Sequence, residues 1–251
     1  MNTRQMRCAN DFNSDKMQFQ DTPYVTPQNA RFISMLYNNT PLIFQTPVLQ
    51  CPNGFKLFTA SPQQPSTRSY PLLVSIPSNE TNFIELINKV DDTVLNTIMM
   101  RSEAWFNKKY ANRDLLNELI DRTIKYKKTY PPSMNLRLKH DKHGKQMFGV
   151  FDNMHKYVSF NTIHDLIDLL PKQVSVQCIV QCNLIWYVNN RIGFSWDILQ
   201  LKICESNTFN ANQFVLNYMF IDDDVNEEQK EIEDETKEED LEDDDSIHFA
   251  F

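Results

Sequence analysis

The most regular pattern in this sequence is a pair of runs, KQVSVQCIVQCNLIWYV (172–188) and GFSWDILQLKIC (193–204), joined by NNRIG. In the first run, apolar residues alternate with others through Val174, Val176, Cys178, Val180, Cys182 and Leu184. Such alternation predicts a strand with one buried face, and the short polar link predicts that the two strands are neighbours. If no bulge intervenes, the same alternation places Trp186 in the core and Tyr187 outside it.

The rest of the chain contains further strand and helix signals. Other expected strands lie at 41–50, 55–61 and 70–76 and in a hairpin pattern at 135–151, with its turn at 141–144. Residues 78–100 change to three- and four-residue apolar spacing, which predicts an amphipathic helix, and 112–128 and 160–170 predict two more helices. Because strands and helices do not alternate in βαβ order, we expect a mainly β fold with inserted helices, as an antiparallel sheet or small barrel.

Charge is distributed unevenly along the chain. Residues 221–251 contain 16 Asp/Glu and 2 Lys, a net charge of −14, which leaves residues 1–220 with a net charge of +6. A basic body with an acidic tail indicates nucleic-acid binding or masking of the body by its own tail. The tail ends in IHFAF, and a role in solubility alone does not explain its two terminal phenylalanines, Phe249 and Phe251.

We find no sign of export or of a membrane segment. Residues 1–40 are rich in Asn and Gln, are expected to form a polar N-terminal arm, and contain no apolar signal region. No run approaches the roughly 18 apolar residues of a membrane helix. The five cysteines show no framework spacing, which favours a reduced intracellular protein.

Sequence signatures of enzymes are largely missing. The chain has no phosphate-binding loop, dinucleotide fingerprint, G-x-S-x-G or H-E-x-x-H motif. The nearest approach to a metal site is His140, Asp141 and His143, which we interpret as a polar hairpin turn before Gly144. We therefore expect no catalytic residue, metal or cofactor, while a nucleic-acid enzyme with a metal at this turn stays an alternative.

The strongest functional signal is a basic segment with interleaved aromatic residues. Residues 101–145 hold 12 Lys/Arg against 5 Asp/Glu, a net charge of +7. Trp105 and Phe106 precede a Lys-Lys-Tyr triplet, and KYKKTY occupies 125–130. Cations neutralise phosphates, while aromatic faces stack on unpaired bases for about 1–3 kcal/mol each. The segment as a whole predicts binding of single-stranded nucleic acid, although each residue singly also fits a solvated helix face with Trp105 and Phe106 in the core.

The last strand pair carries a second aromatic set, Trp186, Tyr187, Phe194 and Trp196, around Arg191. A hydrophobic strand with an aromatic near its end, a short turn, Gly193 and a final strand ending in Leu-Gln-Leu (199–201) precede the acidic tail. This arrangement resembles the single-stranded DNA-binding proteins of the bacteriophage T7 type and their relatives in large nucleocytoplasmic DNA viruses. The order of elements agrees with that family over roughly residues 40–251.

The resemblance implies an OB-fold barrel over residues 41–220, with a helical insertion at about 78–130, followed by a disordered acidic tail at 221–251. It implies sequence-independent coating of unpaired DNA in replication, recombination and repair, with a stacking aromatic at or beside Trp186. It also implies that the tail gates DNA binding. We expect Phe249 and Phe251 to dock on a polymerase, primase or helicase.

The candidate nucleic-acid-binding residues come from the basic segment, the barrel and the last strand pair. They are Lys56, Lys108, Lys109, Arg113, Lys125, Tyr126, Lys127, Lys128, Arg137, Lys139, Trp186, Tyr187 and Arg191. The expected partners are single-stranded DNA and replication proteins, with no membrane, and a homodimer is compatible with them. We expect the protein in a viral factory of the host cytoplasm or in the host nucleus. A virion or scaffold protein whose acidic tail binds basic partners, and an RNA-binding protein, remain alternatives.

Overall fold

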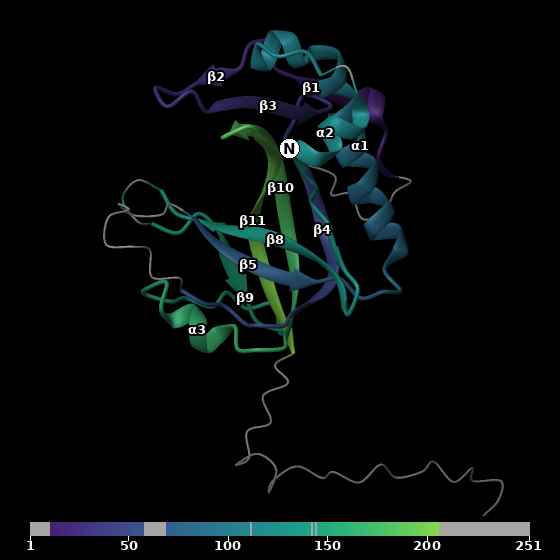
Figure 1. Cartoon of the computed structure of the whole chain (residues 1–251). Coiled ribbons are helices and arrows are strands. Elements are labelled where there is room, and N and C mark those ends of the chain that lie inside the picture. Colours follow the sequence, from purple (N-terminus) through teal and green to yellow (C-terminus); the bar gives the residue numbers. More distant parts are fainter. Residues whose placement is uncertain (1–10, 58–68, 111, 142, 144, 206–251) are drawn as a thin grey trace, which may run out of the picture. The chain divides into compact units, whose positions relative to one another are not determined.

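The computed structural model describes residues 11–57, 69–110, 112–141, 143 and 145–205 (Figure 1). They fall in the first of two units of the chain, Met1–Thr208 and Phe209–Phe251. The predicted acidic tail, with the docking residues Phe249 and Phe251, lies outside the described residues. So does the predicted domain boundary at residue 220.

The two strands that dominate the sequence form one long hairpin. β10 (Val174–Val188) and β11 (Arg191–Glu205) pair in antiparallel register along nearly their whole length. Asn189 and Asn190, with φ of 50° and 61°, make the two-residue turn between them. Positive φ at both turn positions matches the twist of the flanking strands, and asparagine tolerates it well. The two strands predicted from the sequence are confirmed.

The hairpin closes a five-stranded barrel with β4 (Leu42–Cys51), β5 (Ser69–Ser75) and β8 (Tyr130–Lys139). Around the barrel the order is β10–β4–β5–β8–β11, and the β10–β11 pairing closes the ring. Neighbouring strands are antiparallel except β8 and β11, which run parallel. Since β4–β5 and β8–β11 each share a single registered pair, the barrel is partly open. A partly open, five-stranded Greek-key barrel is the OB fold, so the predicted fold class is confirmed.

Alternate residues of the barrel strands point inward and form the core. The buried inward residues include Leu42, Phe44, Leu49, Leu72, Val74, Met134, Leu136, Leu138, Val176, Val180, Trp196 and Ile198. The rings of Phe44 and Trp196 stack there with centroids 5.3 Å apart. Because side chains alternate along each strand, the outward positions of the same strands remain for polar residues.

The amphipathic helix predicted at 78–100 is α1 (Thr81–Phe106), which lies along one side of the barrel in Figure 1. Its buried face includes the apolar residues Phe83, Leu86, Ile87, Val90, Val94, Leu95 and Ile98, at the expected helical spacing. The helix ends where Asn107 takes a left-handed φ of 53° and donates its backbone N–H to the carbonyl of Glu103.

The second predicted helix, at 112–128, is only partly correct. α2 (Arg113–Leu119) is followed by two short strands, β6 (Ile120–Asp121) and β7 (Lys125–Lys127). β6 pairs with β11, and β7 pairs with the start of β8. Pairing with these strands outweighs the good helix propensity of the Lys- and Arg-rich run.

Residues 11–40, the described part of the predicted polar N-terminal arm, contain regular structure. The 3₁₀ turn Ser14–Lys16 leads into β1 (Met17–Phe19), β2 (Tyr24–Val25) and β3 (Arg31–Tyr37). β3 pairs with the end of β10, where Leu184 faces Ser34 and Tyr187 faces Arg31 (Figure 1). The β10–β11 hairpin extends beyond the barrel, and β3 covers the edge of β10 there. The sequence of this N-terminal segment shows little strand pattern of its own.

The remaining elements lie between the third and fourth barrel strands. The predicted hairpin at 135–151 contains β8 and β9 (Gly149–Phe151), but β9 pairs in parallel with β11 rather than with β8. A short helix, α3 (Asp165–Leu169), occupies part of the predicted helix at 160–170. None of the described helices combines the length and apolar character needed to cross a membrane.

Candidate nucleic-acid interface

The outward side of β8 presents two cations that share one carboxylate. Arg137 donates from Nε and Nη2 to Oδ1 of Asp197, at 2.8 Å and 2.6 Å, and Lys139 donates from Nζ to Oδ2 at 3.0 Å. The Asp197 side chain is only 6% exposed, whereas both cations are partly exposed. The carboxylate therefore fixes the two cationic groups side by side, and the cluster keeps a net positive charge.

A lysine-rich hairpin, formed by β7 and the start of β8, lies at the beginning of β8, and we call it the 125–130 hairpin. Its rings of Tyr126 and Tyr130 are 63% and 70% exposed. Lys125 pairs with Asp121, but Lys127 and Lys128 have no ion pair within the part of the chain that the structure describes. Exposed tyrosine faces beside unpaired lysines are the combination that single strands require.

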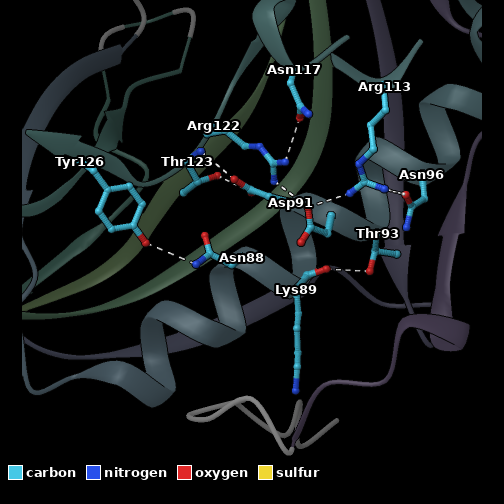
Figure 2. Close-up of polar contacts among 11 residues, drawn as sticks. Asn88, Lys89, Asp91, Thr93, Asn96, Arg113, Asn117, Arg122, Thr123 and Tyr126 are labelled. Carbon is cyan, nitrogen blue, oxygen red and sulfur yellow. Dashed lines mark hydrogen bonds and ion pairs between the residues drawn. The ribbon is translucent and has the colours of Figure 1, made fainter. Parts of the chain in front are cut away.

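The polar side of α1 holds two arginines in place (Figure 2). Arg113 donates to Oδ1 of Asn96 at 2.7 Å and to Asp92 at 3.3 Å, and Arg122 donates to Asp92 at 2.9 Å. Asn117 also accepts from Arg122 at 3.1 Å. The guanidinium of Arg113, a predicted binding residue, therefore braces α2 against α1.

A buried chain of hydrogen bonds supports the base of the 125–130 hairpin. Asp91 of α1 accepts from the backbone N–H and the hydroxyl of Thr123, both at 2.8 Å (Figure 2). The hydroxyl of Thr123 in turn accepts from the indole N–H of Trp196 on β11 at 3.0 Å. Burial raises the pKa of Asp91 to about 6, against the opposing effect of the two Thr123 hydrogen bonds. The network ties helix, hairpin base and barrel together.

A bulge in β10 decides the orientation of Trp186. The register between β10 and β11 shifts between Cys182 and Ile185, so that Ile185 is buried and Trp186 is not in the core. The indole ring lies on Gly193 and donates from Nε1 to the carbonyl of Phe194 at 3.3 Å. Because the bulge removes the condition on which the alternation depended, the alternation ends at Cys182, and Trp186 is partly exposed on the hairpin.

The tip of the β10–β11 hairpin brings together several predicted residues. Tyr187 stacks on Phe106, with ring centroids 4.7 Å apart, and its hydroxyl donates to Oδ1 of Asn190 at 3.2 Å. Lys108 donates to the same Asn190 oxygen at 3.3 Å, and Arg191 donates to the carbonyl of Glu118 at 3.3 Å. Asn190 thus links the tip to the segment that follows α1.

The 125–130 hairpin and the β10–β11 tip contact α1 at two points far apart along the helix. Asn88 donates to the hydroxyl of Tyr126 at 3.4 Å, whereas Tyr187 stacks on Phe106, about 27 Å further along α1. Most of the predicted residues therefore fall into three separate groups: the 125–130 hairpin, the β10–β11 tip with Lys108, and the Arg137–Lys139 pair. Lys56 and Lys109 are exposed, and within the described residues they make no hydrogen bond or ion pair with these groups.

Other positions differ from or add to the sequence prediction. Trp105 is fully buried and donates its indole N–H to the carbonyl of Asp21, so it belongs to the core. Sequence reasoning missed Tyr130 as a candidate, although it ends the KYKKTY run, and it missed Asp197. No signal in the sequence indicates that Asp197 meets Arg137, because their strands pair in parallel and are far apart in the chain.

The predicted polar turn near residue 141 is present. One oxygen of Asp141 accepts from the backbone N–H groups of His143 and Lys145, at 2.8 Å and 2.9 Å. These hydrogen bonds hold the pKa of Asp141 below its usual value. Among the described residues, no group of three His, Cys, Asp or Glu side chains is arranged to hold a metal ion.

Comparison with known proteins gives structural similarity only. No protein-family model matches the sequence, and no match to a curated protein was found. The chain is similar to the single-stranded DNA-binding protein from bacteriophage Enc34 in complex with ssDNA, with a TM-score of 0.45 and 9% identity over 74% of this chain and 96% of that one. It is also similar to gp2.5, a single-stranded DNA-binding protein encoded by bacteriophage T7, with a TM-score of 0.44 and 13% identity over 66% and 93%. Both are phage proteins of the kind that the sequence resembles.

Proposed function

We propose that this chain binds single-stranded DNA without sequence preference and without catalysing a reaction. The observation that carries the proposal is the row of cations and exposed tyrosine rings along β8 and its hairpin, on the outside of an OB barrel. The faces of the second and third barrel strands and the adjoining loops are where OB folds bind oligonucleotides. In this chain those strands are β5 and β8.

The electrostatic part of the proposal rests on four side chains. Lys127 and Lys128 stand at one end of β8, and Arg137 and Lys139 stand near the other. Ten residues of strand extend about 33 Å, which is long enough for several consecutive phosphates of an extended strand. Release of counterions from those phosphates supplies affinity that does not depend on the base sequence.

The stacking part of the proposal rests on exposed rings. Tyr126 and Tyr130 expose more than half of their surface at the hairpin, and Trp186 is partly exposed at the far hairpin. Every base has a π-face, so stacking on such rings tolerates any sequence. Duplex DNA hides its base faces, and the arrangement therefore favours unpaired strands.

The proposal is tested by competition. A labelled oligo-dT of about 30 nucleotides is bound to the full chain, and unlabelled oligo-dT, duplex DNA and oligo-rU are added in equal nucleotide amounts. Oligo-dT is expected to displace the label at lower concentration than duplex. Equal displacement by duplex contradicts the proposal, and stronger displacement by oligo-rU assigns the site to RNA instead.

The biological setting forms a further part of the proposal. A protein that coats unpaired DNA acts in replication, recombination and repair, in a viral factory or host nucleus for a viral genome. The tail at 221–251, with a net charge of −14, is suited to compete with DNA for the body, whose net charge is +6. Phe249 and Phe251 would then dock on a polymerase, primase or helicase once DNA displaces the tail.

A further inference from the structure

A polar pocket lies on a part of the barrel surface that the proposed interface does not use. It has a volume of about 360 Å³, within the range of small-ligand sites. Its walls come from β4, β10 and β11, together with β9 and the loop after it. The side chains that matter for its chemistry are Gln45, Gln177, Gln200, Lys202, Phe151 and His155.

The register of the strands explains why these polar groups converge. Ile179, in the middle strand, lies opposite Gln45 on β4 and opposite Gln200 on β11. One row further along, Gln177 lies opposite Lys202. Adjacent strands are about 4.8 Å apart, so three amides and one ammonium group meet within two neighbouring rows.

Most of these polar side chains have no partner among the residues that the structure describes. Gln177 donates from Nε2 to the carbonyl of Thr46 at 3.2 Å, which leaves its own carbonyl oxygen to accept. Within the described part of the chain, the amides of Gln45 and Gln200 make no side-chain hydrogen bond, and Lys202 makes no ion pair. A ligand can therefore use all of them without breaking an existing contact.

An aromatic ring forms one wall of the pocket. Phe151 lies opposite Lys202 where β9 pairs with β11, and Tyr157 packs edge-on against its ring with centroids 5.8 Å apart. The loop that carries His155 is held by Asp152, whose carboxylate accepts from two backbone N–H groups of the loop. The ring and its wall are thus fixed before any ligand arrives.

We infer that this pocket receives one nucleotide. Each amide offers both a donor and an acceptor, so the three glutamines can pair with the edge of any base. The ring of Phe151 supplies a stacking face, and Lys202 supplies the positive charge for a phosphate. The combination of amides, an aromatic wall and a lysine fits a nucleotide better than a purely apolar or purely anionic ligand.

The nucleotide belongs to a strand that continues from the β8 side of the barrel, and this step rests on the proposed function. Asp197, which holds Arg137 and Lys139, precedes Gln200 by three residues on β11. Three residues of strand correspond to about 10 Å. A strand held by the two cations therefore reaches the pocket over a short stretch of β11.

The test uses the full chain with two pocket variants, Gln200→Leu and Lys202→Gln. Their matched controls are Gln50→Leu, an exposed glutamine of β4 outside the pocket, and Lys172→Gln, an exposed lysine before β10. Thermal melting first establishes that all four variants fold. Dissociation constants are then measured for labelled oligo-dT and, separately, for deoxyadenosine monophosphate.

The pocket variants are expected to weaken oligo-dT binding about fivefold or more, while the controls stay within about twofold of the parent. If the pocket variants bind oligo-dT as tightly as the parent does, the nucleotide in the pocket does not belong to the bound strand. If the monophosphate nevertheless binds the parent and not the variants, the pocket is a site for free nucleotides. If neither ligand responds to the variants, the inference is wrong while the proposed function stands. If the parent binds no oligo-dT, the proposed function fails and the monophosphate alone decides about the pocket.

Discussion

The indole ring of Trp186 lies directly on the backbone of Gly193, its partner across the β10–β11 hairpin. A Cβ atom built on Gly193 would be 2.2 Å from Cζ2 of Trp186, which is far too close for two non-bonded carbon atoms. The absence of a side chain at residue 193 therefore sets the position of the ring on the hairpin.

Replacing Gly193 by alanine is expected to displace Trp186 and to destabilise the fold by about 1–3 kcal/mol, because the new methyl group overpacks the contact. In a Trp186→Ala background the same substitution should cost much less, since the ring is then gone. Urea unfolding of the parent, both single variants and the double variant measures the coupling. If the effects of the two substitutions on the unfolding free energy are additive, the contact between Trp186 and Gly193 is contradicted.

Arg137 and Lys139 share the carboxylate of Asp197, but we expect them to have different roles. Lys139→Gln is expected to weaken oligo-dT binding and to leave the fold intact, because Arg137 still pairs with Asp197. Arg137→Gln should also lower the unfolding free energy, since it removes two of the three hydrogen bonds to a buried carboxylate. Parallel binding and urea measurements check this difference. Equal stability of the two variants would contradict it.

Asp91 makes stability depend on pH in an unusual direction for an aspartate. Its pKa is about 6 in the folded chain, above the ordinary value of 3.8. Between these two pH values the folded state keeps a proton that the unfolded state has lost, so the contribution of Asp91 to stability falls as pH rises from about 4 to 6. By linkage the loss is about 3 kcal/mol.

The Asp91→Asn variant cannot titrate at this position and should lack that pH dependence. The asparagine side chain cannot reproduce both hydrogen bonds that Asp91 makes with Thr123, so the variant is expected to be less stable than the parent at pH 4. The stability gap is expected to narrow as pH rises to about 6.5. Urea unfolding at several pH values measures the gap, and a gap that stays constant would contradict the role assigned to Asp91.

Removal of residues 222–251 should tighten binding of oligo-dT at low salt, because the competing negative charge is gone. The effect should shrink as salt rises, since screening weakens the tail's competition. Phe251→Ala in the full chain is the matched control, because it keeps every acid of the tail. An unchanged dissociation constant for the truncated chain at low salt would argue against gating by the tail.

The parts of the fold that the sequence predicts are those set by local pattern. Alternation from Val174 to Cys182 predicts the first half of β10, and the apolar spacing from Phe83 to Ile98 predicts α1. The bulge after Cys182 is not predictable in this way. It arises from pairing with β11 and β3, whose partners are known only from the structure.

The same limit applies to the candidate site. The KYKKTY run marks the position of the 125–130 hairpin. The sequence predicts a helix for β7, because the extended conformation of this strand depends on its pairing with β8. Arg137 and Lys139 are recognisable as outward residues of a strand. Their partner Asp197 is not recognisable, since a parallel contact between distant segments leaves no local pattern in the sequence. The pocket that contains Gln45, Gln177 and Gln200 is not predictable for the same reason, because its residues come from distant strands.

The most direct test of the central claim is a salt titration of oligo-dT binding by the full chain and by a Lys127→Gln, Lys128→Gln double variant. Single strands give a log–log slope of about −0.7 per phosphate neutralised, so the double variant should lose about 1.4 of the parent's slope. A double variant of two exposed lysines elsewhere, Lys16→Gln and Lys172→Gln, should keep it. Identical slopes for the parent and the hairpin variant, or no preference of the parent for oligo-dT over duplex, would contradict a DNA-binding face on β8 and its hairpin.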